Sequence, residues 1–168
     1  MTKKTNHYID NKQFLQALID YREACEKAEE DPPIPNYIGE CFYKIAEHLS
    51  RKPNFISYSF RDEMISDGIE NCLMYFRNFD PEKSKNPFAY FTQIIYYAFL
   101  RRITKEKKQL YVKYKATEQY GLIDEHEELP GGGLRQFELY DNIAEFIQTF
   151  EENKKKKKEA KKGIEKFI

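Results

Sequence analysis

Residues 61–115 read RDEMISDGIENCLMYFRNFDPEKSKNPFAYFTQIIYYAFLRRITKEKKQLYVKYK, and this stretch decides the predicted fold. Apolar residues in its first half recur at spacings of three and four, which places them on one side of a helix. These positions are Ile65, Gly68, Ile69, Cys72, Leu73, Phe76 and Phe79. The residue before a proline is driven out of the α region, so Asp80-Pro81 ends the helix. The pattern therefore predicts a helix over Arg61–Phe79.

A second helix begins at Asn86-Pro87, because asparagine is a good cap and proline is tolerated at the first helical position. We expect this helix to run to Lys107 and to carry two stripes. The first stripe is Phe88, Phe91, Ile95, Ala98, Phe99 and Arg102, and it is apolar except for its last member. The second stripe is Tyr90, Gln93, Ile94, Tyr97 and Arg101. A single core-facing side explains the first stripe but not the aromatic residues on the second.

The far end of this helix is strongly basic. Residues 101–115 hold seven lysines and arginines against Glu106 alone, a net charge of +6. Aromatic rings that lead into a run of cations suit a strand of nucleic acid, since cations neutralise phosphates while rings stack on unpaired bases. A core helix with a solvated lysine-rich end gives the same pattern. The residues by themselves leave both interpretations open.

Two more helices precede this pair. Asp10 or Asn11 caps a predicted helix over Asn11–Glu30, and the proline-rich segment Asp31–Pro35 then breaks the chain. Asn36 caps a further helix over Asn36–Ser50. Residues 1–9 are predicted to be disordered. The fold class that follows is all-α, with residues 10–115 forming a compact bundle of four helices.

The remainder of the chain changes in character. Residues 116–153 form a predicted acidic linker, in which positions 118–145 hold eight acidic residues and one arginine, a net charge of −7. A hinge at Pro130–Gly133 interrupts this linker, and a short amphipathic helix over Phe137–Phe150 follows. This helix could pack on the bundle or bind a partner protein, and the sequence leaves both possibilities open. Residues 154–168 are a lysine-rich tail, predicted to be an extended tether with an apolar end. The apolar residues of that end are Ile164, Phe167 and Ile168.

Composition argues against several functional classes. The 28 basic and 28 acidic residues cancel, and no apolar run reaches membrane-spanning length, so we predict no membrane contact. Three scattered histidines and three widely spaced cysteines predict no metal, no cofactor and buried thiols in a reducing compartment. A nuclease-like cluster of carboxylates could be drawn, but no base motif accompanies it, and we predict a protein that is not an enzyme. Its members would be Asp62, Glu63, Asp67 and Glu70.

Four short motifs lie in register over residues 64–104. They are Asp67-Gly68, Phe79-Asp80, Phe88-Ala89-Tyr90-Phe91-Thr92 and Arg101. Their order and spacing resemble, without gaps, region two of bacterial RNA polymerase sigma factors. The length and the tail of the chain make it look most like the late-gene sigma factors of T-even-type bacteriophages. The detailed likeness covers residues 36–115.

The resemblance implies a specificity subunit, found in the cytoplasm of the host bacterium near the nucleoid, that binds core RNA polymerase without catalysing a reaction itself. It would recognise and melt an A·T-rich minus-ten-type promoter element. The implied contacts with a coiled coil of the largest polymerase subunit are Glu63, Ser66, Asp67, Glu70 and Leu73. The implied contacts with the non-template DNA strand are Phe79, Asp80, Lys83, Tyr90, Gln93, Ile94, Tyr96, Tyr97, Leu100, Arg101, Lys105 and Lys108.

Individual roles follow from the same resemblance. Phe79, Asp80, Lys83 and Tyr90 match the pocket that holds a flipped adenine, with Tyr90 as the stacking ring. The family has two tryptophans where this chain has Gln93-Ile94, so the wedge against the upstream base pair is altered. The apolar end of the tail would dock on a phage sliding clamp, in concert with a coactivator. Alternatively, the lysines of the tail bind DNA without specificity and the apolar residues are idle.

Two other functional classes stay open. A nucleic-acid-binding protein that never contacts polymerase would share the basic helix but would have no use for the acidic face of the preceding helix. A polymerase-bound adaptor or anti-sigma regulator would need the acidic face but not the pocket around Tyr90.

Overall fold

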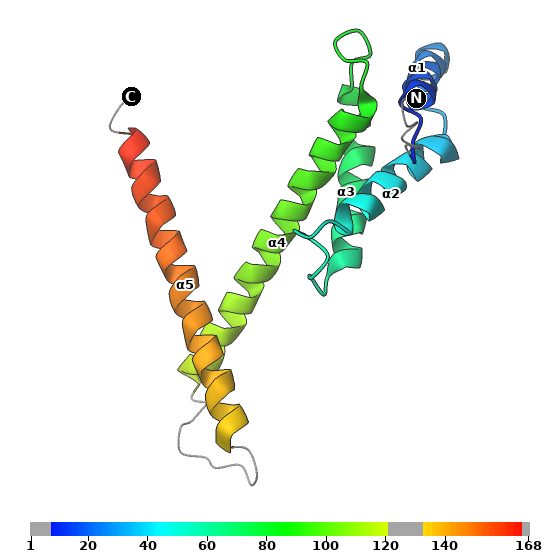
Figure 1. Ribbon diagram of the computed structural model, residues 1–168. Coiled ribbons are helices and arrows are strands. Elements are labelled where there is room, and N and C mark those ends of the chain that lie inside the picture. The colour runs from blue at the N-terminus through cyan, green and yellow to red at the C-terminus, as the bar shows by residue number, and fades with distance from the viewer. Residues whose placement is uncertain (1–7, 121–132, 166–168) are drawn as a thin grey trace, which may run out of the picture. The chain divides into compact units, whose positions relative to one another are not determined.

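The structure is a computed structural model that describes residues 8–120 and 133–165, and side chains within 8–120 and 142–160. The described residues are helical with connecting turns and contain no strand, which confirms the predicted all-α class. The elements are α1 (Asn11–Lys27), α2 (Asn36–Ser50), α3 (Arg61–Tyr75), the 3-10 helix η1 (Phe76–Asn78), α4 (Pro87–Gln119) and α5 (Gly133–Glu165) (Figure 1). The chain divides into two compact units, Met1–Ile103 and Thr104–Ile168.

The first unit is a bundle of α1, α2, α3 and residues 87–103 of α4, around an aromatic core. The Phe42 and Phe91 rings lie 4.7 Å apart between centroids, and Phe14 lies 5.6 Å from Phe91. Its largest fully buried residues include Phe14, Ile38, Phe42, Ile45, Met64, Phe91, Ile95 and Phe99. The unit ends before the predicted residue 115, because residues 111–115 of α4 contact α5 instead.

Local signals account for where the first helix starts and where it stops. The Asp10 carboxylate accepts hydrogen bonds from the backbone N–H groups of Lys12 and Gln13, at 2.8 and 3.2 Å, and caps α1 as predicted. The helix stops at Lys27, short of the predicted Glu30, because the chain is already extended at Ala28. The Tyr21 hydroxyl donates to the Pro32 carbonyl at 2.8 Å and ties the following segment back onto α1.

Helix α2 has the predicted bounds but not the predicted cap. Asn36 is its first helical residue, Pro35 occupies the cap position, and no side chain supplies a capping hydrogen bond there. Proline at this position adds no N–H of its own, and its carbonyl accepts from the Ile38 N–H at 3.0 Å, so the backbone serves one of the first-turn donors.

The third helix ends at Tyr75 rather than at the predicted Phe79, and the 3-10 helix η1 follows. A 3-10 helix has about three residues per turn, so residues three apart lie on one line. This change of winding turns both Phe76 and Phe79 into the core, where each is buried. In an α-helix, residues three apart still share a face but are offset by about 60°, so the 3-10 turn aligns the two rings more closely.

The start of α4 is tied to the N-terminal segment. Asn86 caps it as predicted, with its side-chain oxygen accepting from the Ala89 N–H at 3.1 Å. The Asn11 side chain accepts from the Phe88 N–H at 3.1 Å and donates to the Lys85 carbonyl at 3.2 Å. Residues 1–9 were predicted to be disordered, but Ile9 is buried in the core and the Tyr8 ring stacks on His48 at 3.8 Å.

Helices α3 and α4 approach each other closely at Gly68. A Cβ atom at this position would lie 3.0 Å from Cγ2 of Ile95 and 3.2 Å from the Phe99 ring. Both neighbours are fully buried and have little room to move. The absence of a side chain at Gly68 therefore sets the distance between the two helices.

The second unit is a helical hairpin. Helix α4 continues past the predicted end at Lys107 to Gln119, and the Tyr111 and Phe150 rings stack at 4.4 Å. The Tyr114 ring meets the Phe146 ring edge-on at 5.6 Å.

Helix α5 differs from two predictions. It is not confined to Phe137–Phe150, and the lysine run that follows is helical rather than an extended tether. Lysine is a good helix former and no proline follows Pro130, so the helix can continue from the packed part. The predicted hinge at Pro130–Gly133 lies outside the described residues except for Gly133, the first residue of α5.

Candidate functional site

The predicted base-stacking residue lies at the start of α4 beside a buried phenylalanine. Tyr90 is half-buried, and its ring meets Phe79 at 5.2 Å and Phe91 at 5.1 Å, both edge-on. Phe79 is buried, so its ring supports Tyr90 from behind and does not offer a face of its own. Two of the four predicted pocket residues are therefore in contact, with one as the partly accessible ring and the other as its support.

The other two predicted pocket residues organise the turn between η1 and α4. Asp80 accepts from the Glu82 N–H at 3.0 Å and pairs with the Lys83 ammonium at 3.3 Å. These two interactions, the backbone one first, lower the pKa of Asp80. A base that bound Asp80 or Lys83 would compete with this ion pair.

The outer surface of α4 in the first unit carries most of the remaining predicted DNA contacts. Exposed members are Gln93, Tyr96, Tyr97, Leu100 and Arg101. Tyr96 also touches Phe55 edge-on at 5.7 Å, which anchors one end of this aromatic surface. Ile94 is half-buried and packs against the core, so Gln93 alone is exposed at the two altered wedge positions. Lys105 and Lys108 belong to the second unit and are exposed there.

The outer surface of α3 carries the predicted polymerase contacts. Glu63, Ser66, Glu70 and Leu73 are exposed and follow one another at spacings of three and four, so they form one stripe. Leu73 was also assigned to the core stripe, which is wrong: it is 39% exposed, and its neighbours Met74 and Tyr75 are 57% and 46% exposed. Sequence reasoning missed Met74 and Tyr75. Three consecutive apolar residues cannot all lie on one side of a helix, and this signal could have revealed them.

Asp67 is the exception among these residues, because it is engaged within the bundle. The Arg102 guanidinium donates to both carboxylate oxygens of Asp67, at 2.6 and 2.7 Å, and both side chains are largely covered. Next to this pair, Arg101 donates to the Asn71 side-chain oxygen at 2.6 Å. Asp67 was predicted to lie off the packed side of its helix, and this placement is wrong, because the ion pair with Arg102 holds it against α4. Its contact with polymerase stays a prediction. A cation at the end of the apolar stripe of α4 was the available signal for a buried ion pair.

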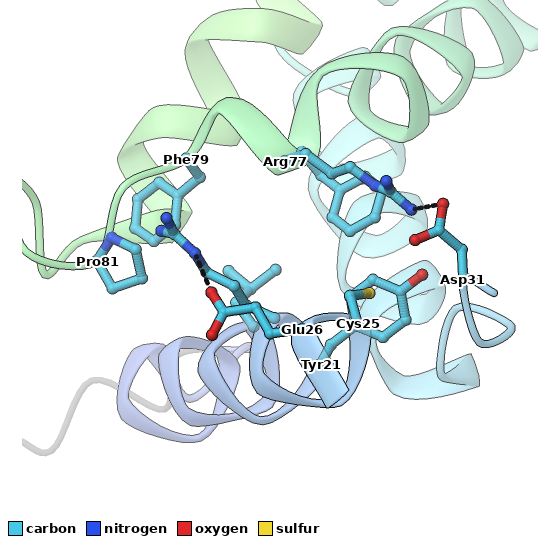
Figure 2. Close-up of a pocket in the computed structure, with 10 residues that line it drawn as sticks. Tyr21, Cys25, Glu26, Asp31, Arg77, Phe79 and Pro81 are labelled. Carbon is cyan, nitrogen blue, oxygen red and sulfur yellow. Dashed lines mark ion pairs between the residues drawn. The ribbon is translucent and has the colours of Figure 1, made fainter. Parts of the chain in front are cut away.

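A cavity of about 350 Å³ lies between α1, the segment after it and η1. Figure 2 shows Tyr21, Phe79 and Pro81 around this cavity, with the ion pair between Arg77 and Asp31, 2.7 Å long, at one side. The cavity is also lined by Cys25, which is half-buried, so the prediction of three buried thiols holds only for Cys41 and Cys72. Burial raises the pKa of the Cys72 thiol to about 12.

Among the side chains that the structure describes, in 8–120 and 142–160, no three of histidine, cysteine, aspartate or glutamate gather as a metal site would require. Within residues 8–120 and 133–165, none of the helices combines the length and the apolar character that a bilayer crossing demands. Of the predicted clamp-binding residues, Phe167 and Ile168 lie outside the described residues, as does the Ile164 side chain. Their docking on a sliding clamp stays a prediction.

Comparison with known proteins assigns no family to this chain. No protein-family model matches the sequence, and no curated protein matches it significantly.

Proposed function

We propose that the chain is a sigma factor of the phage late-gene type, which directs a bacterial-type RNA polymerase to A·T-rich promoters in the host cytoplasm. One observation carries the proposal: two adjoining helices present exposed surfaces of opposite character. The surface of α3 is acidic with an apolar end, and that of α4 is aromatic and ends in Arg101. A sigma factor needs both surfaces, one for the enzyme and one for the promoter.

The outer surface of α3 is better explained as a protein interface than as an ordinary solvent-exposed face. Leu73 and Met74 lie one turn beyond Glu70 and are exposed, so an apolar end adjoins the acidic stripe of α3. Apolar groups with a charged rim are typical of protein interfaces. A nucleic-acid-binding protein that never contacts polymerase would gain nothing from this surface.

The α4 surface supports a role in DNA melting. Flipping a base costs a few kcal/mol, and stacking on an aromatic ring returns about 1–3 kcal/mol. Tyr90 is suited to this because the buried Phe79 and Phe91 rings hold it in place. An adaptor or anti-sigma regulator without DNA recognition would have no use for a supported, partly accessible ring.

The direct test uses core RNA polymerase without its own sigma factor. We expect the full chain to co-purify with this core enzyme and to support run-off transcription from an A·T-rich late-type promoter. Co-purification without transcription would favour the adaptor or regulator. DNA binding without co-purification would favour a nucleic-acid-binding protein outside transcription initiation.

In the same assay, Tyr90→Ala is expected to reduce open-complex formation on duplex promoters about tenfold, within the range of a lost stacking interaction. Promoters that are already unpaired across the element should recover part of this loss, since melting no longer has to be driven. Tyr90→Phe is the matched control, because it keeps the ring, and it should behave as wild type. Equal losses on duplex and unpaired templates would reduce Tyr90 to a packing residue.

The apolar end of the chain is proposed to bind a DNA-tracking sliding clamp, with a coactivator completing the activated complex. Replacing Phe167 and Ile168 together by serine keeps every lysine and removes the apolar contact, so only clamp-dependent stimulation of transcription should be lost. Burial of each side chain contributes about 1.5–3 kcal/mol before ordering costs, which gives a weak contact that tethering strengthens. Unchanged stimulation would leave the lysines as the active part of the tail.

A further inference from the structure

The hairpin of the second unit has a seam whose chemistry changes along its length. Tyr111 faces Phe150 and Tyr114 faces Phe146, so residue numbers rise along α4 as they fall along α5 and the helices are antiparallel. Around these rings, Ile143 and Ile147 are buried. This part of the seam is an ordinary apolar contact.

The packed part ends in a polar layer at Glu151. The Tyr111 hydroxyl donates to Glu151 at 2.9 Å, and the Lys115 ammonium lies 3.6 Å from the same carboxylate oxygen. The hydrogen bond from Tyr111, followed by the charge of Lys115, lowers the pKa of Glu151. Lys115 also pairs with Glu118 at 2.8 Å, so two carboxylates neutralise the cation of this layer.

Beyond Glu151, both helices become cationic at the same level. One helical turn onward from Phe150 along α5 is Lys154, and one turn back from Tyr111 along α4 is Lys107. The next turn of α5 places Lys157 and Lys158 on the seam side, while Lys155 and Lys156 lie away from it. These five lysines of α5 are exposed, as are Lys105, Lys107 and Lys108 of α4.

Lysines thus line both helices beyond Glu151, and the lysines of each helix repel one another. Like charges one turn apart also disfavour the helix that carries them. The flanking Glu152 and Glu159 lie four residues from Lys156 and Lys155, so these acidic neighbours compensate the lysines that lie away from the seam. A polyanion bound to these lysines would relieve this repulsion.

We propose that this cationic seam, formed by Lys107, Lys108, Lys154, Lys157 and Lys158, binds the phosphate backbone of double-stranded DNA without regard to sequence. Residues 104–110 and 151–165 contain no aromatic residue, so this surface has no ring on which unpaired bases could stack. Lysine is a flexible point charge and suits phosphates whose position varies along the duplex. The inference does not rest on the proposed sigma activity, because polymerase plays no part in it.

The test compares two variants of the full chain with identical charge and helix propensity. Lys154→Gln with Lys157→Gln removes two seam-side cations, and Lys155→Gln with Lys156→Gln removes two cations on the other side. Binding to a fluorescent duplex of random sequence is measured by anisotropy over a range of salt concentrations, without polymerase. Each lost phosphate contact should lower affinity about tenfold near 0.1 M salt and reduce the salt slope by about 0.9.

The seam-side variant is therefore expected to lose about two contacts, and the control variant fewer than one. Lys154→Arg with Lys157→Arg should bind as wild type, which separates loss of charge from loss of fold, and circular dichroism should show equal helix content in all variants. If the two glutamine variants weaken duplex binding equally, or if neither weakens it, the seam is not the DNA-binding surface. Tighter binding to single-stranded DNA, or to phosphatidylserine vesicles, than to duplex would overturn the choice of partner. Failure to bind core polymerase would affect the sigma proposal alone.

Discussion

Glu63→Lys combined with Glu70→Lys is expected to abolish co-purification of the chain with core RNA polymerase. Both carboxylates are exposed on the α3 surface, and neither makes a hydrogen bond or ion pair within the described residues. Like charges brought together across an interface cost several kcal/mol, and every 1.4 kcal/mol is a tenfold change in affinity. The expected loss is therefore at least about 100-fold, with the fold unchanged.

The matched control for this variant is Glu29→Lys with Glu30→Lys, which makes the same charge change at exposed positions just beyond α1. It should bind the core enzyme like the wild type. Binding can be quantified by titrating labelled protein with core polymerase at fixed ionic strength. If the α3 variant binds as tightly as the control, the polymerase surface lies elsewhere on the molecule.

Asp67→Ala is expected to destabilise the first unit by about 2 kcal/mol, because it removes two hydrogen bonds from a largely covered guanidinium. A hydrogen bond to a charged group contributes about 1.5–3 kcal/mol to stability. The Arg102 side chain is only 16% exposed, so water replaces the lost partner poorly. Asp62→Ala removes an exposed carboxylate from the same helix and should change stability by less than about 0.5 kcal/mol. Urea unfolding followed by circular dichroism measures both.

A double-mutant cycle separates the ion pair from other effects of the substitution. Arg102→Met keeps much of the apolar volume of the side chain and removes its charge, so the double variant should be more stable than the sum of the single losses predicts. Strictly additive losses would show that Asp67 and Arg102 contribute independently. If Asp67→Ala also weakens polymerase binding, the loss of stability is the first explanation to test, before a lost contact with the enzyme.

The starts of α1 to α4 and the end of α2 were predictable, whereas the ends of α1, α3 and α4 were not. Asp10 and Asn86 act locally, and each places its cap within three residues of its own position. The ends depend on contacts distant in sequence: Tyr75 gives way to η1 so that Phe76 and Phe79 both reach the core. Helix α4 likewise passes Lys107 because Tyr111 and Tyr114 find rings on α5, a pairing that no local pattern reveals.

The candidate site divides in the same way. Periodicity on one helix correctly placed Glu63, Ser66 and Glu70 on the outer surface of α3. The same reasoning failed for Asp67, because its environment is set by Arg102 on another helix. It also missed that Phe79 supports Tyr90 from the core side, which depends on the 3-10 winding of the preceding residues.

The close contact at Gly68 fixes the distance between the outer surfaces of α3 and α4. Ile95 and Phe99 rest against bare backbone there, so no side chain can slide between α3 and α4. Under the proposed function, the helix that binds the enzyme (α3) and the helix that contacts the promoter (α4) then form a rigid pair with a fixed separation. The interval between polymerase and the unpaired base would be set by this close approach together with the Asp67–Arg102 ion pair beside it. Adaptation to a different promoter interval would therefore require a change where Gly68 meets Ile95 and Phe99.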